Sequence, residues 1–227
     1  MGVYGFSIDQ LMEMAGYSCA CAIAKEYSLN EYKQIFIVCG PGNNGFPLKF
    51  ALTFRGDGLV AARHLSHFGY CPTVYYPKKS SGTLFSNLLK QNESMDIPLA
   101  DHCPTLEELK ENYDLVVDAI FGFSFHGSPR PPFDSIISIL NECGKPVVSV
   151  DIPSGWDVND GDIHECAVHN PDMLISLTAP KLGSQKFSGR FHYLGGRFLP
   201  PKYAREHNIQ IPSYPGCEQC VRLSSVC

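Results

Sequence analysis

Two carboxylates end apolar runs of the chain in the same way. Asp118 closes the run DLVVD and is followed by a loop with glycine and serine at residues 122–128. Asp151 closes the run PVVSVD and is followed by Ile-Pro-Ser154-Gly155. A carboxylate in such a place costs free energy to desolvate unless something uses it. Both residues are therefore candidates for chemistry, and the alternative interpretation is that Asp and Ser cap the helices that follow.

Three oxygen-bearing side chains could jointly hold a hard cation. Asn44, Asp118 and Ser154 offer amide, carboxylate and hydroxyl oxygens, which suit such an ion. One carboxylate and two neutral oxygens carry little charge, which favours a monovalent ion or a hydrated magnesium ion over a tight calcium site. Asp151 then remains free to act as a general acid or base. His126 and Lys181 are further polar candidates, although a lone histidine in a Phe-rich loop more often packs than reacts.

A glycine-rich segment, GPGNNG at residues 40–45, matches the spelling G-x-G-x-x-G. Glycines there would let backbone amides approach a phosphate, and a following helix N-terminus would favour its charge. The alternative is a tight, Asn-rich turn. Two features weaken the dinucleotide interpretation. Lys78 and Lys79 stand where an acidic ribose ligand is expected, and residues 46–55 separate the glycines from the helix entry at residues 56–59.

Two other kinds of site are less well supported. Ser124 lies in G-x-S-x-x-G, one residue away from the nucleophile elbow of hydrolases, and no clear order of Asp and His follows it. Cys217 and Cys220 form one C-x-x-C pair without a second pair or spaced histidines, so zinc is not expected. The ten cysteines lie singly, several inside apolar runs, which predicts reduced and buried thiols.

The elements that must position these residues alternate along the chain. Short apolar runs predict strands at 35–39, 72–77, 114–122, 146–151 and 172–180, and a last, edge strand at 190–198. Helical spacing and end signals predict helices at 7–26, 56–70, 81–92, 105–112 and 132–144. Nearly continuous apolar strands between helices indicate an α/β fold with a parallel sheet covered on both faces. In such folds the ligand lies outside the carboxyl ends of the strands.

Composition excludes several classes of protein. The 227 residues carry a net charge of −5, so neither nucleic acid nor an anionic membrane attracts the chain electrostatically. Non-specific binding to either is therefore not expected. No apolar run reaches the roughly 18 residues of a membrane span. No linker divides the chain, so we expect a single domain over 1–227, with a Pro-rich C-terminal tail from about 200 that wraps the surface. The first residues show neither a secretory signal nor a transit peptide.

Six segments in order resemble the YjeF N-terminal family of NAD(P)H-hydrate epimerases: GFSIDQLMEMAG, GPGNNG with GDGLVAARHL, VVDAIFGFSFHG, SVDIPSGWDV, DMLISLTAPK and FHYLGGRFLPP. The resemblance implies a Rossmann-like three-layer α/β/α fold with a mostly parallel central sheet, and a homodimer. It implies interconversion of the R and S forms of hydrated NADH and NADPH (NADHX and NADPHX) as cofactor repair. It implies one K+ per subunit, held by Asn44, Asp118 and Ser154. The substrate-binding residues it implies are Asn43, Asn44, Gly45, Gly56, Asp57, Gly122, Phe123, Ser124, Phe125, His126, Gly127, Ser128 and Asp151. Acid/base chemistry is assigned to Asp151.

The chain departs from the family pattern at two places. Residues 46–55 interrupt a loop that is continuous in the family, so we expect the fold to survive and the ligand site to be weakened. His126 and Ser128 stand where the family usually has Lys and Asp. The alternative function is therefore a catalytically weak isoform that binds apolipoprotein A-I in lipid efflux. By the same resemblance, the expected location is mitochondrial or cytosolic, with secretion as a further expectation.

Overall fold

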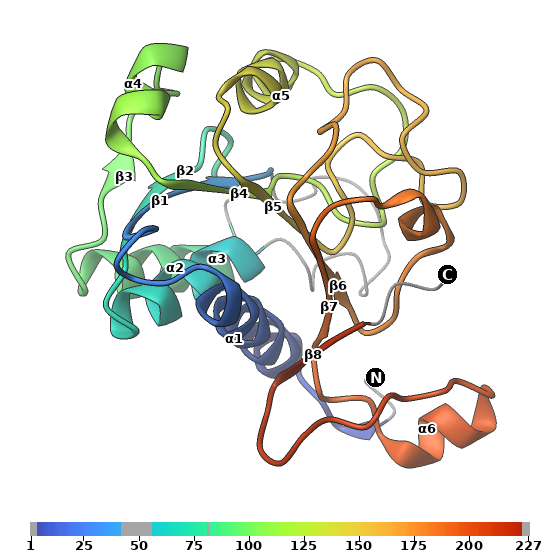
Figure 1. Ribbon diagram of the computed structural model, residues 1–227. Coiled ribbons are helices and arrows are strands. Elements are labelled where there is room, and N and C mark those ends of the chain that lie inside the picture. Colours follow the sequence, from blue (N-terminus) through green and yellow to red (C-terminus); the bar gives the residue numbers. More distant parts are fainter. Residues whose placement is uncertain (1–3, 42–55, 81, 224–227) are drawn as a thin grey trace.

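The computed structural model describes residues 4–41, 56–80 and 82–223. Asn43, Asn44, Gly45 and the insertion at 46–55 therefore lie outside the described residues. Within them, eight strands form one central sheet in the order β3-β2-β1-β4-β5-β6-β7-β8 (Figure 1). All neighbours pair in parallel except β7 and β8. The strands are β1 (Gln34–Cys39), β2 (Cys71–Tyr75), β3 (Leu99–Ala100), β4 (Leu115–Ala119), β5 (Val147–Val150), β6 (Met173–Leu177), β7 (Phe191–Gly195) and β8 (Cys220–Arg222).

Helices cover both faces of the sheet and give the three-layer α/β/α fold that was predicted. Figure 1 shows α1, α2 and α3 on one side of the sheet and α4 and α5 on the other. Each side has its own apolar core beneath its helices. The helices are α1 (Ile8–Glu26), α2 (Asp57–His67), α3 (Thr83–Glu93), α4 (Leu106–Asn112), α5 (Phe133–Glu142), the 3-10 helix η2 (Leu182–Lys186) and α6 (Pro201–Glu206). No helix among the described residues is long and apolar enough to cross a bilayer.

Local sequence accounts for the main elements. The strand β1 is apolar and buried from Ile35 to Cys39. Its side chains are apolar on both faces because helices cover both sides of the sheet. At the start of α1, Ser7 accepts a hydrogen bond from the Gln10 backbone N–H, and the Gln10 side chain accepts one from the Ser7 N–H. This capping box fixes the first turn of the helix.

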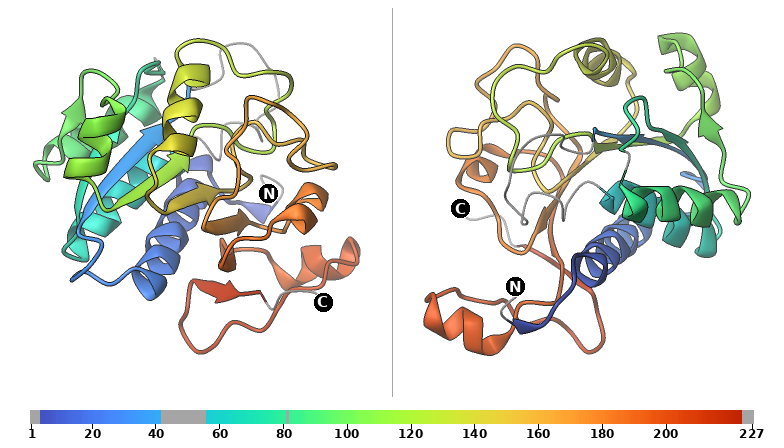
Figure 2. Two further views of the ribbon diagram at one scale, coloured as in Figure 1. Left: turned by 45° about the horizontal axis from the view of Figure 1, so that its top comes forward. Right: turned by 180° about the vertical axis from the view of Figure 1, so that it is seen from behind.

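The C-terminal part of the sheet differs from the expectation. The segment 190–198 is not the last, edge strand, because β8 pairs antiparallel with β7, with Leu194 opposite Val221. The tail also contains α6, so it does more than wrap the surface (Figure 2). Only three residues form β8, too few for an apolar run to reveal it. Arg222 on this strand forms an ion pair of 3.3 Å with Glu26 on α1.

The strand order reverses direction between β1 and β4, and this is the position where open α/β sheets bind ligands. Two glycines allow close packing there. A Cβ on Gly40 would lie 1.5 Å from the Ile120 carbonyl oxygen, so only glycine lets the chain leave β1 beside β4. A Cβ on Gly58 would lie 2.8 Å from Cys39 Sγ and 2.9 Å from Ala119 Cβ. The first turn of α2 is thereby seated on the carboxyl ends of both strands.

Candidate functional site

Asp118 is the centre of a buried hydrogen-bond network at the carboxyl end of β4. Its side chain is fully buried. Ser154 donates to it twice, from Oγ at 2.5 Å and from the backbone N–H at 2.9 Å. Ser149 Oγ donates at 2.9 Å, and the Ile120 N–H at 3.3 Å. Ser149 lies opposite Asp118 in the β4–β5 pairing, so the parallel register itself brings these residues together.

The charge of Asp118 has no cationic partner among the residues that the structure describes. Burial raises the pKa of its carboxyl, and the hydrogen bonds from Ser154, Ser149 and Ile120 oppose that rise. A buried carboxylate that is surrounded only by neutral donors is stabilised when a cation binds beside it. A carboxylate oxygen and a hydroxyl oxygen lie 2.5 Å apart here, joined by the Ser154–Asp118 hydrogen bond. Asp118 and Ser154 thus supply oxygen atoms of the kind that a hard cation takes, and the third predicted ligand, Asn44, lies outside the described residues.

Asp151 follows β5 directly and is paired with a lysine. Its side chain is 1% exposed, and Lys181 Nζ forms an ion pair with Asp151 Oδ1. The Phe123 N–H donates to Asp151 Oδ2 at 2.8 Å. Lys181 also donates to the Leu177 carbonyl at 3.0 Å, and its Nζ lies 5.6 Å from the centre of the Phe123 ring. One carboxylate therefore joins the loop after β4 to the loop after β6.

Two neighbouring strands end in left-handed backbone. Asp151 has φ 70° at the end of β5, and Thr178 has φ 67° at the end of β6. This conformation is unfavourable for residues with a Cβ, and most of all for a β-branched residue such as threonine. Strained residues of this kind are concentrated at ligand-binding sites, where the surrounding structure holds them in place.

Asp57, in the first turn of α2, completes the set of carboxylates. Its side chain is fully buried, and neither carboxyl oxygen has a hydrogen-bond partner among the described residues. Burial raises the pKa of Asp57 well above its usual value, the negative charge of Asp151 raises it further, and Lys181 lowers it. The charges of Asp151 and Lys181 thus both act on the carboxyl at the start of α2.

The predicted site residues are only partly brought together by contacts. Asp118 and Ser154 form one cluster, and Asp151 binds the Phe123 backbone, as described above. Within the predicted substrate loop, Gly122 to Phe125 are half-buried and His126 to Ser128 are exposed. Gly56 is buried beside Asp57, packed against Met12 and Leu88. The sequence predicts Lys181 only as a further polar candidate, yet it is the direct partner of Asp151. Its place four residues after β6 was the available signal.

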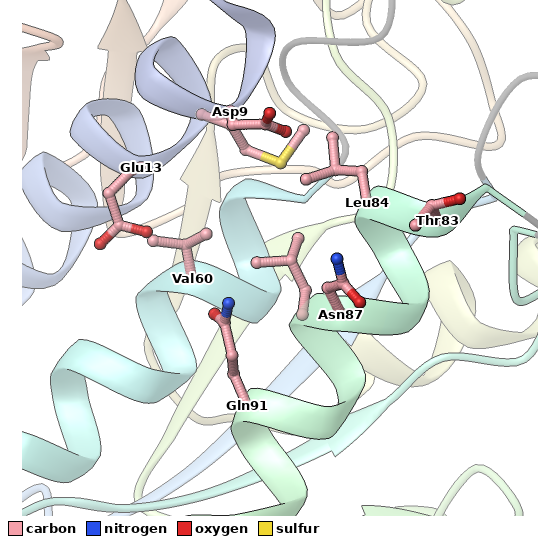
Figure 3. A pocket seen from close by; sticks show the side chains of 9 residues that line it. Asp9, Glu13, Val60, Thr83, Leu84, Asn87 and Gln91 are labelled. Atoms are coloured by element: carbon pink, nitrogen blue, oxygen red, sulfur yellow. The ribbon is translucent and has the colours of Figure 1, made fainter.

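The remaining candidates are a metal site of His, Cys, Asp or Glu side chains, the pair Cys217 and Cys220, and a surface hollow; none of them belongs to the predicted substrate site. The described part of the chain holds no group of three or more His, Cys, Asp or Glu placed to bind a metal, and Cys217 and Cys220 are free thiols. A hollow of about 330 Å³ lies between α1, α2 and α3. Figure 3 shows its walls, with Asp9 and Glu13 on α1 facing Asn87 and Gln91 on α3. None of its lining residues belongs to the predicted substrate site.

Comparison with known proteins identifies the family. The model for "YjeF-related protein N-terminus" matches residues 8–183. The crystal structure of yeast YNL200c superposes with a TM-score of 0.88 at 38% identity, covering 98% of this chain and 93% of that one. The chloroplastic pyridoxine/pyridoxamine 5'-phosphate oxidase 1 of Arabidopsis thaliana is 50% identical over 98% of this chain. This chain spans only 42% of that relative's length. A Sinorhizobium meliloti transhydrogenase, at 15% identity over 63% of this chain and 40% of that one, reaches a TM-score of only 0.34, too distant to inform the site. The matched residues and the shared fold show that the chain belongs to the YjeF-related N-terminal family, which at family level comprises isomerases that epimerise hydrated NAD(P)H.

Proposed function

We propose that this chain interconverts the R and S forms of hydrated NADH and NADPH. The observation that carries the proposal is the buried Asp151–Lys181 ion pair, which lies at the carboxyl edge of the sheet and binds the Phe123 backbone. The substrate carries a hydroxyl on a carbon next to the nicotinamide ring nitrogen. Epimerisation needs one proton to be supplied and recovered at that hydroxyl, and it needs no net redox change.

Asp151 is the residue to which we assign the acid/base role. Asp151 Oδ1 receives a proton from Lys181 Nζ and passes it to the hydroxyl, the C–O bond breaks, and water leaves. The lone pair of the ring nitrogen forms a C=N bond, which leaves a flat iminium ion. Water then adds to either face and returns its proton to the pair. Lys181 positions the carboxylate and balances its charge, while the bond from Phe123 fixes its orientation.

K+ is the cofactor that we propose for the Asp118 cluster, with Asp118, Ser154 and Asn44 as its holders. When bound, it supplies a fixed positive charge close to an anionic dinucleotide. A ligand that binds only the folded state raises the melting temperature. We therefore expect K+ to stabilise the chain more than the bulky choline cation does, and Asp118→Asn to remove the difference. Equal melting temperatures in both salts would contradict the assignment without any measurement of activity.

The central test is the rate of R-to-S conversion of NADHX, followed by chromatography of the two epimers. Loss of one acid/base group typically slows a reaction by about 10²- to 10⁴-fold, and we expect Asp151→Asn to fall in that range. Asp160→Asn is the matched control, because Asp160 is exposed on the following loop. A folded Asp151→Asn chain with the wild-type rate would refute the assignment.

If the wild-type chain converts NADHX no faster than the spontaneous reaction, the insertion at 46–55 is one explanation for the missing activity. The sequence predicts that residues 46–55 weaken the ligand site. A chain without these ten residues is then expected to recover the activity. A binding module that never epimerised hydrated cofactors would stay inactive after the same deletion.

A further inference from the structure

A groove of about 430 Å³ lies at the carboxyl ends of β6 and β7. One wall is the turn after β6, from Thr178 to Pro180, and the next residue is Lys181, the partner of Asp151. Residues 209–214, which follow α6, also line the groove. The groove and the proposed reaction centre thus share one short turn of the chain.

The lining of the groove suits a flat aromatic group that is linked to an anion. The Tyr214 ring is half-buried, and the Arg197 guanidinium lies 5.4 Å from its centre. Leu199 and Ile211 add apolar surface. Among the described residues that line the groove, Arg197 alone carries a formal charge, and it is positive.

Arg197 is held in place by the chain around it. Its Nη1 donates to the Gly216 carbonyl at 2.6 Å and to the Glu218 carbonyl at 3.0 Å. A guanidinium that is fixed in this way loses little further freedom when it meets a ligand. Thr178 and Ser213 supply hydroxyls to the groove. This set of groups matches a purine base with its ribose and phosphate.

We infer that this groove binds the adenosine half of the dinucleotide, while the hydrated nicotinamide lies at Asp151. The inference rests on the proposed function, because that function sets the length and chemistry of the ligand. A cofactor with two nucleoside halves needs a second binding region, and the turn at 178–180 that lines the groove leads directly into Lys181, the partner of Asp151. Its volume is in the range of ordinary ligand pockets. The Tyr214 ring offers the face on which a base stacks.

The first arm of the test measures ligand binding alone. Adenosine 5'-diphosphate is titrated into the full chain by calorimetry, with Tyr214→Ala and Tyr214→Phe as the variants. We expect the wild type and Tyr214→Phe to bind alike, because both keep the ring. Loss of one base–aromatic stack should weaken binding to Tyr214→Ala about tenfold. No binding by the wild type, or equal binding by all three chains, would overturn the inference. The inference would also fail if Tyr214→Ala instead dissociated a dimer, because a second copy would then fill the groove.

The second arm separates this inference from the proposed function. The KM for NADHX should rise about tenfold in Tyr214→Ala at unchanged kcat. The kcat/KM for hydrated, reduced nicotinamide mononucleotide, which has no adenosine, should not change. If the wild type accelerates the epimerisation of neither substrate, the proposed function is refuted. The calorimetric titration would then still show whether the groove binds adenosine 5'-diphosphate. Equal losses for both substrates would overturn the adenosine assignment and leave the function in place.

Discussion

Replacement of Asp57 by Asn should make the chain progressively more stable than the wild type as the pH rises. The carboxyl of Asp57 is fully buried and has no hydrogen-bond partner in the part of the chain that the structure describes, and its pKa in the folded state lies well above the usual value of 3.8. Between pH 3.8 and the folded-state pKa, the folded chain keeps a proton that the unfolded chain has released. A rise in pH across this window therefore favours unfolding of the wild type. The asparagine side chain of the variant does not titrate, so the variant escapes this loss.

The size of the effect follows from the linkage between protonation and folding. One fully titrating group changes the free energy of unfolding by at most about 1.4 kcal/mol per pH unit. In a chain of this length, 1 kcal/mol shifts the melting temperature by about 2–4 °C. The gap between Asp57→Asn and the wild type should therefore widen by up to about 3–6 °C per pH unit within the window. The amide that the substitution introduces is also unpartnered, but its cost does not depend on pH.

Thermal unfolding at pH 5, 6 and 7 in a K+-free buffer provides the assay. Asp9→Asn is the control, because Asp9 also lies in the first turn of a helix and is exposed. Its difference from the wild type should stay within about 0.5 kcal/mol at each pH. Parallel pH curves for Asp57→Asn and the wild type would refute the reasoning. They would mean that the carboxyl is solvated or paired, contrary to the structure.

Three further predictions concern the packing around the site. Ser154→Ala should cost about 3 kcal/mol in urea unfolding and Ser149→Ala about half as much, because Ser154 Oγ both donates to Asp118 and accepts the Phe121 N–H at 3.0 Å. Equal costs would contradict the network. Gly58→Ala should cost about 1–3 kcal/mol and slow epimerisation, since the new methyl group displaces the first turn of α2. Burial lowers the pKa of His192 to about 4, so it contributes to a loss of stability as the pH falls from about 6.5 to about 4. Substitution of this histidine by Gln should flatten that part of the pH–stability curve.

The central strands and the cluster of Asp118 and Ser154 can be predicted from the sequence for a physical reason. Long β-branched runs are buried on both faces, and parallel strands bring all their carboxyl ends to one edge. Asp118 and Ser154 could therefore be placed together although 36 residues separate them. The resemblance of the motifs to the family implies the roles of these residues, which their spacing alone leaves open.

Other features depend on tertiary contacts that leave no local pattern. The two residues of β3 and the three residues of β8 are too short to show periodicity. The bond between Lys181 and Asp151 requires the turn after β6 to fold back over the end of β5. The missing partners of Asp57 are a property of its surroundings, and residue type alone does not reveal them.

The two outer strands of the sheet have a consequence for self-association. The sheet ends in β3, with two residues, at one side and in β8, with three, at the other. Each edge thus offers only a few unpaired backbone groups to another chain, far fewer than the five residues of β7 would have exposed. Short edge strands are one way in which proteins resist sheet extension and aggregation. A second copy of this chain is consequently expected to dock through side-chain surfaces rather than by adding its sheet to this one.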